Sequence, residues 1–548
     1  LITSIILKEL FATGTISIKN FYERRIRRIL PALFFVMLVS VPFAWMYLIP
    51  SSFIDYSKSI LYSLGFSSNY YFHYSGQVYG AVSGFFKPFL HTWSLSVEEQ
   101  FYIIFPFSLL IIYKYFKKYL IHILIFGFLI TLGLAEWSSK NYPSTSFYFL
   151  HTRMWELLAG SILAYFEITL GRTSKHKTLN LVLPTIGIIL IGYFILFYDS
   201  SIKHPSLHTL LPILGVSLII WFSNKNEIIT TILSSKLFVG VGLISYSLYL
   251  WHYPIFSLLK INGIVSNSIA GKLVLIPIII ILSVFSYYFI ERPFRNRNFS
   301  FKKVLLLLGI LFFSLLIINI KIIEENGFKK RFENFKKINQ NYDPDNFFLG
   351  QSKMKNSKTN FDKYKSKDFN IIIIGDSHGG DLFNALYLNR NLFNDTNFYF
   401  GGDVFEYGLL KYEKFIKDSD IVIISYKWSN NNYNLLKENF KKIFNLNKKI
   451  IITSSSNEYK TPSKLYTLID YKILYEKKDF DYFGLKKLYY DNRVIHSTSD
   501  INRKLKEFAL QNKLNYLNHE DYMCDISKKE CDYVDENGYK IFYDYGHY

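Results

Sequence analysis

Cysteine is almost absent from this chain of 548 residues, which contains only Cys524 and Cys531. One pair of thiols, without a second pair of ligands at a suitable spacing, argues against a zinc site, and we expect no metal. The two cysteines are close enough in sequence to pair in an oxidising compartment, and the alternative is two unpaired thiols. A disulfide that closes so short a loop would contribute roughly 2–3 kcal/mol through the entropy of the unfolded chain.

A starting methionine and a recognisable secretory signal are also missing. The chain begins at Leu1, and its opening LITSII reads as the end of an apolar span, so we expect a fragment without its natural N-terminus. No nucleic-acid-binding motif is present, although the net charge is +20. Because cytoplasmic loops of membrane proteins collect Lys and Arg, the charge favours a membrane protein without a nucleic-acid partner.

Apolar residues make up 50% of the chain, and they are concentrated in long runs before residue 323. A bilayer core of about 30 Å requires about 20 apolar residues in one helix. The runs that approach this length are 29–49, 97–113, 119–136, 148–167, 179–199, 206–222, 237–258, 272–290 and 303–323. We interpret the stretch 57–72, which is short and rich in serine, as interfacial or re-entrant.

The distribution of positive charge gives an expected orientation. If RRIRR (24–28) is placed on the cytoplasmic side, the cytoplasmic loops hold seventeen Lys and Arg and the opposite loops hold six. This bias follows the positive-inside rule and places everything after residue 323 outside the cytoplasm. The same four arginines have two interpretations: a topology anchor, or an anion site for a phosphate-bearing donor such as coenzyme A. They are Arg24, Arg25, Arg27 and Arg28.

Four polar clusters lie in or beside the apolar runs. Ionisable groups at membrane depth are expensive, so they indicate function by default, with their partners facing a bundle interior. The alternative is a set of structural ion pairs and interfacial aromatic residues. The clusters are HTWSLSVEEQFY (91–102), HTRMWELLAG (151–160), SYSLYLWHYP (245–254) and YFIERPFR (288–295). Their candidate residues are His91, Glu98, Glu99, Arg153, Glu156, Tyr246, His252 and Glu291.

Five ordered segments together resemble the acyltransferase 3 family: FYERRIRRILPAL, HTWSLSVEEQFY, TRMWELLAGS, ISYSLYLWHYPIF and YFIERPFR. Members are bacterial multi-span membrane proteins that O-acylate surface polysaccharides. The resemblance covers roughly residues 1–323 and implies that the candidates above handle the acyl group and its donor, acetyl-coenzyme A. The family pattern also has an N-terminal span with an essential Arg and His. That span is missing here, and His91 and His252 belong to other motifs and do not replace its histidine.

The second half of the sequence has a different pattern. Residues 324–368 are polar and charged, and we interpret them as a linker. Continuous β-branched runs then occur at 370–375, 420–425 and 449–454, separated by helical stretches. This is typical of a parallel sheet covered on both faces. The expected fold is therefore a multi-span α-helical membrane bundle (1–323), the linker, and an α/β domain with a parallel sheet flanked by helices (369–548).

A candidate nucleophile lies at the end of the first of these strands. GDS places Ser377 between the strand and a helical pattern, where a helix N-terminus would favour a developing oxyanion. The base that a serine requires is available in DYGH near the end of the chain, where Asp544 would orient His547. A strand followed by GDS, with D-x-x-H at the end of the domain, resembles SGNH hydrolases and acetyl-transferring domains that share their fold. A turn serine and an unrelated histidine is the alternative.

Other SGNH elements are less well defined in the sequence. Gly401 or Gly402 could supply the oxyanion glycine, and Asn430 is a loose match to the usual Asn block. His378 follows the nucleophile directly, so we expect it to line the site or cap the turn rather than act as the base. The disulfide would brace the segment that carries Asp544 and His547. The family usually continues with a short closing helix, so we expect the C-terminus to be clipped.

These features predict a relay. The membrane half would take an acetyl group from cytoplasmic acetyl-coenzyme A, Ser377 would accept it as an ester, and a sugar hydroxyl of an envelope polysaccharide would attack that ester. The acceptor could be lipopolysaccharide O-antigen, peptidoglycan or an exopolysaccharide. Two alternatives remain at this stage: an extracytoplasmic esterase that removes acetyl groups, and a transporter of a lipid-linked sugar with an external binding domain.

Overall fold

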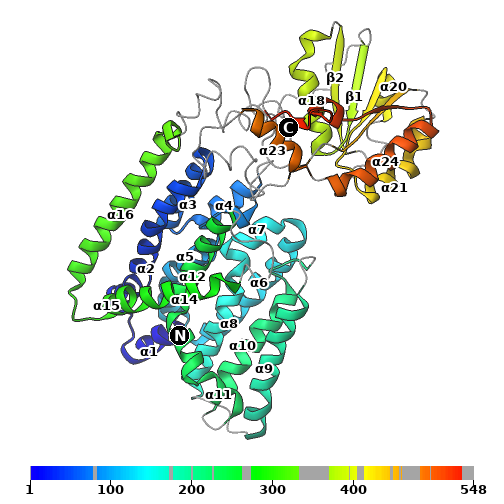
Figure 1. The fold of residues 1–548 in the computed structure, drawn as a ribbon. Helices are drawn as coiled ribbons and strands as arrows, with labels where there is room; N and C mark the ends of the chain where they lie inside the picture. Colours follow the sequence, from blue (N-terminus) through cyan, green and yellow to red (C-terminus); the bar gives the residue numbers. More distant parts are fainter. Residues whose placement is uncertain are drawn as a thin grey trace. The chain divides into compact units, whose positions relative to one another are not determined.

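The computed structural model describes residues 2–77, 83–171, 177–198, 202–224, 227–261, 273–331, 369–393, 395–403, 413–444, 448–455, 458–459, 482–493 and 495–533 (Figure 1). The chain divides into two units. A helical unit comprises Leu1–Met46, Ser52–Leu259 and Val265–Gly327, and an α/β unit comprises Tyr47–Ser51, Lys260–Ile264 and Phe328–Tyr548. The predicted linker lies mostly outside the described residues.

The described part of residues 1–331 is helical, and each predicted span overlaps a helix. The elements are α1 (Ile2–Thr13), α2 (Ile18–Tyr47), α3 (Pro50–Leu64), α4 (Ser68–Gly76), α5 (Thr92–Phe116), α6 (Leu120–Asn141), α7 (Pro143–Tyr148), α8 (Leu150–Thr169), α9 (Lys177–Phe197), α10 (Leu210–Phe222), α11 (Ile228–Leu233), α12 (Lys236–Ile261), α14 (Leu275–Ser286), α15 (Arg292–Arg295) and α16 (Phe301–Glu324). A π-helical turn, Tyr287–Glu291, joins α14 to α15.

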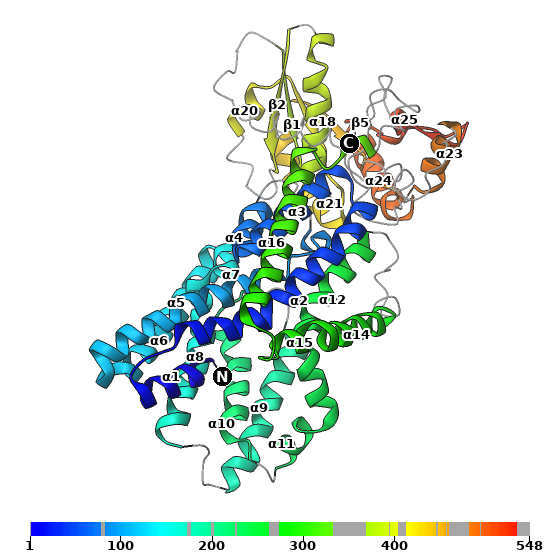
Figure 2. The ribbon, with the colours of Figure 1, turned by 90° about the vertical axis from the view of Figure 1, so that its left-hand side faces the viewer.

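Five of the described helical segments are long and apolar enough to cross a membrane. They are Ile18–Tyr47, Thr92–Asn141, Thr178–Phe197, Leu275–Arg295 and Phe301–Glu324. The stretch 57–72, which the sequence suggests is interfacial, is also helical and belongs to α3 and α4. Figure 2 shows α16 running beside α2, where Phe312 packs against Phe34 with ring centroids 6.2 Å apart.

Several hydroxyl side chains of the helical unit are buried between its helices. Ser63 and Thr92 share a buried hydrogen bond of 2.8 Å between their hydroxyls, and Ser68 and Ser96 share another of the same length. Leu196, in contrast, is 77% exposed. Hydroxyls that bond one another between helices, together with exposed leucines, are what a bilayer solvent favours, because lipid offers no hydrogen-bond partner.

The sequence predicts a parallel sheet from three strands, and a five-stranded parallel sheet forms the centre of the α/β unit. Its strands are β1 (Phe369–Ile374), β2 (Thr396–Gly402), β3 (Ile421–Ile424), β4 (Lys449–Thr453) and β5 (Asn515–Leu517), in the order β2-β1-β3-β4-β5. The helices around it are α18 (Ser377–Leu388), α20 (Glu413–Asp418), α21 (Asn430–Phe444), α23 (Tyr482–Asp491), α24 (Ile495–Gln511) and α25 (Glu520–Met523).

Both faces of the sheet are buried, which explains the four consecutive isoleucines of β1. Ile372 and Ile374 belong to a core cluster that includes residues of α20, α21 and α24. Ile373 faces the other way and packs with Phe383 of α18 and with Phe398. Because side chains alternate along a strand, a strand that is covered on both faces must be apolar at every position.

The strand order reverses direction beside β1, and this fixes where a site can form. From β1 the chain passes to β2 on one side and later to β3 on the other. In open parallel sheets, ligands bind outside the carboxyl ends of the strands at such a switch point. Ser377 directly follows the carboxyl end of β1, so the predicted nucleophile lies at this position.

Cys524 and Cys531 form a disulfide. It links β6 (Cys524–Asp525) to β7 (Glu530–Cys531), which pair antiparallel, and both cysteines are buried. The closed hairpin ends just before residue 534, where the described part of the chain stops.

Candidate functional site

Candidate residues from separate sequence motifs line one cavity of the helical unit, with a volume of about 380 Å³. Helices α1, α2, α5, α8 and α12 all contribute to it. The polar lining residues are Thr3, Arg25, Arg28, Glu98, Glu99, Tyr102, Glu156 and Tyr246. Six of these are predicted candidates, and the structure brings them together although 221 positions of sequence separate Arg25 from Tyr246. We call this space the acidic cavity.

The charges of the acidic cavity are held in a defined arrangement. The Arg25 guanidinium lies over the ring of Tyr102, 4.9 Å from its centroid. Glu99 is buried, and its Oε1 has no hydrogen-bond partner among the residues that the structure describes. A buried carboxylate oxygen without a partner is costly unless a bound group satisfies it. The cavity is therefore suited to a polar ligand.

A second cavity, of about 460 Å³, lies beside the first. Its lining includes five arginines, three from α2 and two from the segment after the π-helical turn: Arg24, Arg27, Arg28, Arg295 and Arg297. Arg28 and Tyr246 line both cavities. Clustered guanidinium groups are the preferred protein ligands of phosphate groups. We call this space the arginine cavity.

Two of the predicted candidates have structural partners. Arg27 donates its Nε to Glu23 at 2.9 Å and its Nη2 to the carbonyl of Phe299 at 2.8 Å, so it ties α2 to the segment before α16. Glu291 is fully buried, accepts a hydrogen bond from Ser247 of α12 and pairs with Arg295 Nη2 at 2.5 Å. Glu291 lines neither cavity.

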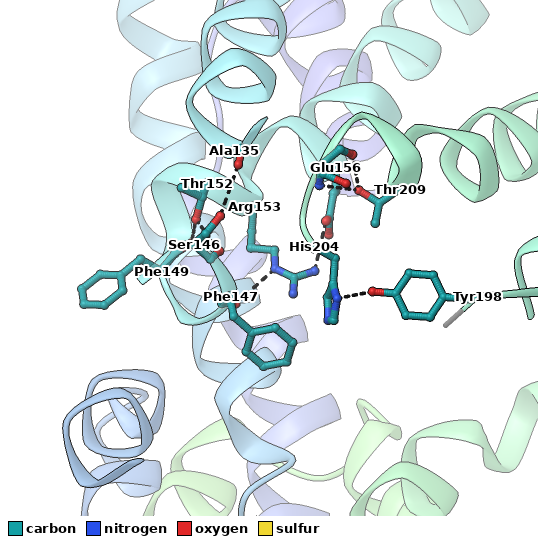
Figure 3. A network of polar contacts seen from close by, with 11 residues as sticks. Ala135, Ser146, Phe147, Phe149, Thr152, Arg153, Glu156, Tyr198, His204 and Thr209 are labelled. Atoms are coloured by element: carbon teal, nitrogen blue, oxygen red, sulfur yellow. Dashed lines mark hydrogen bonds and ion pairs between the residues drawn. The ribbon is translucent and has the colours of Figure 1, made fainter. Parts of the chain in front are cut away.

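Arg153 does not line the acidic cavity but bonds Glu156, which does. Its Nη1 is 3.1 Å from Glu156 Oε1, and its Nε donates to the carbonyl of Phe147 at 3.2 Å. The guanidinium also lies 5.1 Å from the ring centroid of Trp93. Figure 3 shows Arg153 pointing between Phe147 and His204, with Tyr198 bonded to His204 beyond it. Arg153 is thus fixed by one ion pair and two aromatic rings.

His91 and His252 form a separate cluster and line neither cavity. Their ring centroids are 5.5 Å apart. Tyr249 and Tyr253 of α12 surround the buried His91 ring at 5.0 and 5.6 Å. We call His91 and His252 the imidazole pair.

In the α/β unit, two glycines determine how closely Ser377 approaches the rest of the sheet. A Cβ on Gly375 would lie 1.8 Å from the carbonyl oxygen of Ser425, at the end of β3, and one on Gly379 would lie 2.7 Å from the same oxygen. Neither position tolerates a side chain without movement of the backbone. The spacing of glycines in GDSHGG therefore allows the first turn of α18 to pack against the end of β3.

Asp376 fixes the turn that presents Ser377. It is the N-cap of α18, and its Oδ1 accepts the backbone N–H of His378 at 3.0 Å. The same carboxylate accepts the backbone N–H of Lys427, after β3, at 3.0 Å. Burial raises the pKa of the Asp376 carboxyl, and these N–H groups act in the opposite direction.

The remaining predicted residues of this site lie at several positions in the α/β unit. Gly402 adopts φ +71° at the end of β2, and its carbonyl accepts the N–H of Gly375 at 3.0 Å, so it lies beside the GDS turn. Gly401 is buried within β2. Asn430 begins α21 and accepts from Lys504 of α24 at 3.4 Å. His378 is buried next to Ser377. Asp544 and His547 lie outside the described residues, so their role stays a prediction.

Several residues at these sites are not found by sequence reasoning. Trp93, Tyr249 and Tyr253 fall inside the quoted motifs, but nothing in their spacing indicates which rings they contact. His519 follows β5 and donates its Nδ1 to the carbonyl of Ser454, after β4, at 2.8 Å. Burial lowers its pKa. A histidine at the carboxyl end of a strand could have indicated this position. However, β5 has only three residues, which is too short to be predicted from the sequence.

Comparison with known proteins gives a family and relatives. The acyltransferase 3 family, described as an acyltransferase domain, matches residues 10–287. The peptidoglycan O-acetyltransferase OatA of Listeria monocytogenes is 32% identical over 314 residues, which cover 55% of this chain and 50% of that protein. The O-acetyltransferase OatA of Staphylococcus aureus is 28% identical over 317 residues, which cover 55% and 51%. The chain spans about half the length of these curated relatives. No solved structure matches.

Proposed function

The chain belongs to the acyltransferase 3 family, and we propose that it moves an acetyl group from cytoplasmic acetyl-coenzyme A onto a sugar hydroxyl of an envelope polysaccharide. Peptidoglycan is the first acceptor to test, because one relative is named for that activity. The bias of Lys and Arg across the apolar runs supports a location of the α/β unit outside the cytoplasm.

The observation that carries this proposal is the pair of cavities that share Arg28 and Tyr246. An acyl-coenzyme A has two chemically different parts, a polyanionic nucleotide and a neutral thioester at the end of a flexible arm. The arginine cavity suits the phosphates of the first part. The acidic cavity suits the polar thioester end, where Arg25 can polarise a carbonyl and Glu99 can accept a hydrogen bond.

Ser377 is the proposed acceptor of the acyl group in the α/β unit. Its position at the first turn of α18 places backbone N–H groups where they can stabilise an oxyanion. His547 would act as the general base of the Ser377 site, and Asp544 would orient the imidazole. A sugar hydroxyl would then attack the ester carbon, and the proton would return to Ser377 Oγ.

The test is mass spectrometry of envelope glycans from cells that produce the full-length protein or its Ser377→Ala variant. We expect loss of O-acetyl groups in the variant, with the Ser429→Ala variant as a control for an exposed serine after β3. A gain of acetyl groups in Ser377→Ala would instead support an esterase. Unchanged acetylation, together with loss of glycan export in Arg153→Ala and Glu156→Ala, would support a transporter.

A further inference from the structure

The imidazole pair has polar atoms that the surrounding protein does not satisfy. His91 is 6% exposed, and neither of its ring nitrogens has a hydrogen-bond partner among the residues that the structure describes. Its ring is packed against Phe89, Tyr249, Tyr253 and His252. Packing accounts for the ring but not for the nitrogens, because a phenylalanine would fill this space without leaving buried polar atoms.

His252 is held in one tautomer. Its Nδ1 lies 2.7 Å from the backbone carbonyl oxygen of Tyr249, and because a carbonyl can only accept, Nδ1 carries the proton. In the neutral ring, Nε2 therefore carries the lone pair. His252 is exposed, and no side chain or backbone group in the described part of the chain bonds Nε2. A neutral imidazole with an open Nε2 is a nucleophile.

The imidazole pair lies further along the same two helices that line the acidic cavity. On α5, eight residues separate His91 from Glu99, which is about 12 Å at 1.5 Å per residue. On α12, six residues separate Tyr246 from His252, which is about 9 Å by the same rise. The two helices run in opposite directions: α5 starts beside His91 and proceeds toward Glu99, whereas α12 proceeds from Tyr246 to His252. The imidazole pair therefore lies about 9–12 Å along α5 and α12 from residues that line the acidic cavity.

We propose that His252 Nε2 is an acyl carrier of the membrane half, with His91 as the base that acts when the acyl group leaves. This inference rests on the proposed function. The ligand of the site is the acyl group of a thioester donor, and an acyl-imidazole keeps that group activated for transfer to a hydroxyl. Carriage of the acyl group by the pair would link the donor cavities to the far ends of α5 and α12.

Each step balances. The Nε2 lone pair attacks the carbonyl carbon of the thioester, the carbon–nitrogen bond forms, the carbon–sulfur bond breaks, and the thiolate leaves. The product is an acyl-imidazolium. Its Nδ1 keeps the proton and still donates a hydrogen bond to the carbonyl of Tyr249. The oxygen of an acceptor hydroxyl then attacks the same carbon, its proton passes to a nitrogen of His91, the carbon–nitrogen bond breaks, and neutral His252 is restored. His91 releases the proton, which balances the thiolate formed first.

The experiment uses the full chain in detergent or vesicles, with acetyl-coenzyme A labelled in its acetyl group. The Ser377→Ala background blocks the next acceptor of the relay, so label should accumulate on the protein. We expect neutral hydroxylamine to release it, because acyl-imidazoles are labile under conditions that spare oxygen esters. Peptide mapping should locate one acetyl group at His252. Adding His252→Gln should lower the label at least tenfold, whereas the matched histidine variant His122→Gln, on α6, should not.

A second variant separates chemistry from packing. His91→Phe keeps the aromatic contacts and removes the nitrogens, so we expect acetyl-His252 to form while onward transfer to glycan falls at least tenfold. Label that resists neutral hydroxylamine, maps elsewhere or persists in His252→Gln would overturn the inference. So would the absence of label in Ser377→Ala when the wild-type chain acetylates glycan. If the wild-type chain acetylates no glycan at all, the proposed function itself fails, which distinguishes the two failures.

Discussion

The helical unit and the α/β unit differ in the residues that they leave exposed: the helical unit exposes many large apolar side chains and buries some of its charged groups. In the helical unit, Phe289 is 65% exposed while the neighbouring Glu291 is fully buried. In the α/β unit, Ile373 is fully buried, and polar groups such as Lys427 lie at the carboxyl edge of the sheet. The difference shows that the solvent decides which groups are enclosed: lipid drives charge inward, and water drives apolar side chains inward.

The largest expected effect of breaking this pattern is on a buried charge of the helical unit. Glu291→Ala removes the acceptor of Ser247 and leaves Arg295 without its carboxylate. Breaking a fully buried ion pair costs roughly 3–5 kcal/mol. Arg295 is 33% exposed, so we expect a smaller cost but still a clear fall in the thermal unfolding midpoint of the detergent-solubilised chain. The control is Glu325→Ala, which breaks an exposed ion pair with Lys321 and should change the midpoint little. Equal midpoints for the two variants would contradict this account of Glu291.

The next effect concerns the arginine that both cavities share. Arg28→Ala should lower acetyl transfer by about 10–100-fold, because a hydrogen bond to a charged group contributes about 1.5–3 kcal/mol. The measurement is the rate of acetyl transfer from acetyl-coenzyme A by the full chain in vesicles. Arg292→Ala is the matched control, since Arg292 lines neither cavity and stacks on Tyr288. A similar loss in both variants would show that the cavities have no special role.

In the α/β unit, the disulfide allows a comparable test without a change of charge. Reduction, or the Cys524→Ser variant, should destabilise the hairpin of β6 and β7 by roughly 2–3 kcal/mol. We expect faster hydrogen exchange across residues 524–533, and slower acetyl transfer if this hairpin braces the segment that bears His547. Exchange that is unaffected by reduction would rule out a bracing role.

The smallest expected effect is a dependence of the α/β unit on pH. Burial lowers the pKa of His519, so its folded form binds a proton less readily than its unfolded form. Its contribution to stability is fully present above the unfolded pKa of about 6.5 and is lost as the pH falls from there toward the folded value. The hydrogen-exchange protection factors of Ser454 and His519, corrected for the intrinsic exchange rate at each pH, should therefore fall below pH 6.5. His519→Asn, which can keep the bond to the Ser454 carbonyl, should remove this dependence; if the dependence persists, another group causes it.

The local sequence pattern was sufficient to predict most helices of the helical unit and the central strands of the α/β unit. Runs of apolar residues located the helices, and the continuous isoleucines of β1 and β3 predicted a sheet covered on both faces. β2 was missed because NFYFGG alternates weakly and ends in glycines, and β5 because three residues give no periodicity. The candidate site was likewise predicted only in part. The motifs identified Arg25, Glu99 and Glu156, but only tertiary packing shows that they meet in one cavity.

Packing also distinguishes candidates that are adjacent in the sequence. Arg27 bonds the Phe299 carbonyl and lines only the arginine cavity, whereas Arg28 lines both cavities. Adjacent helical residues point about 100° apart, so a charge cluster contains both kinds of residue. The contact between Asp376 and Lys427 could not be predicted from the sequence, because it joins groups that are 51 residues apart.

The central claim is that this chain carries an acetyl group from a thioester to a glycan hydroxyl through Ser377. The most direct measurement supplies sealed vesicles containing the full chain with labelled acetyl-coenzyme A on the arginine side and peptidoglycan fragments on the other. The account predicts label in alkali-labile esters on the fragments, and none with Ser377→Ala. Equal labelling of the fragments by wild type and Ser377→Ala would contradict it.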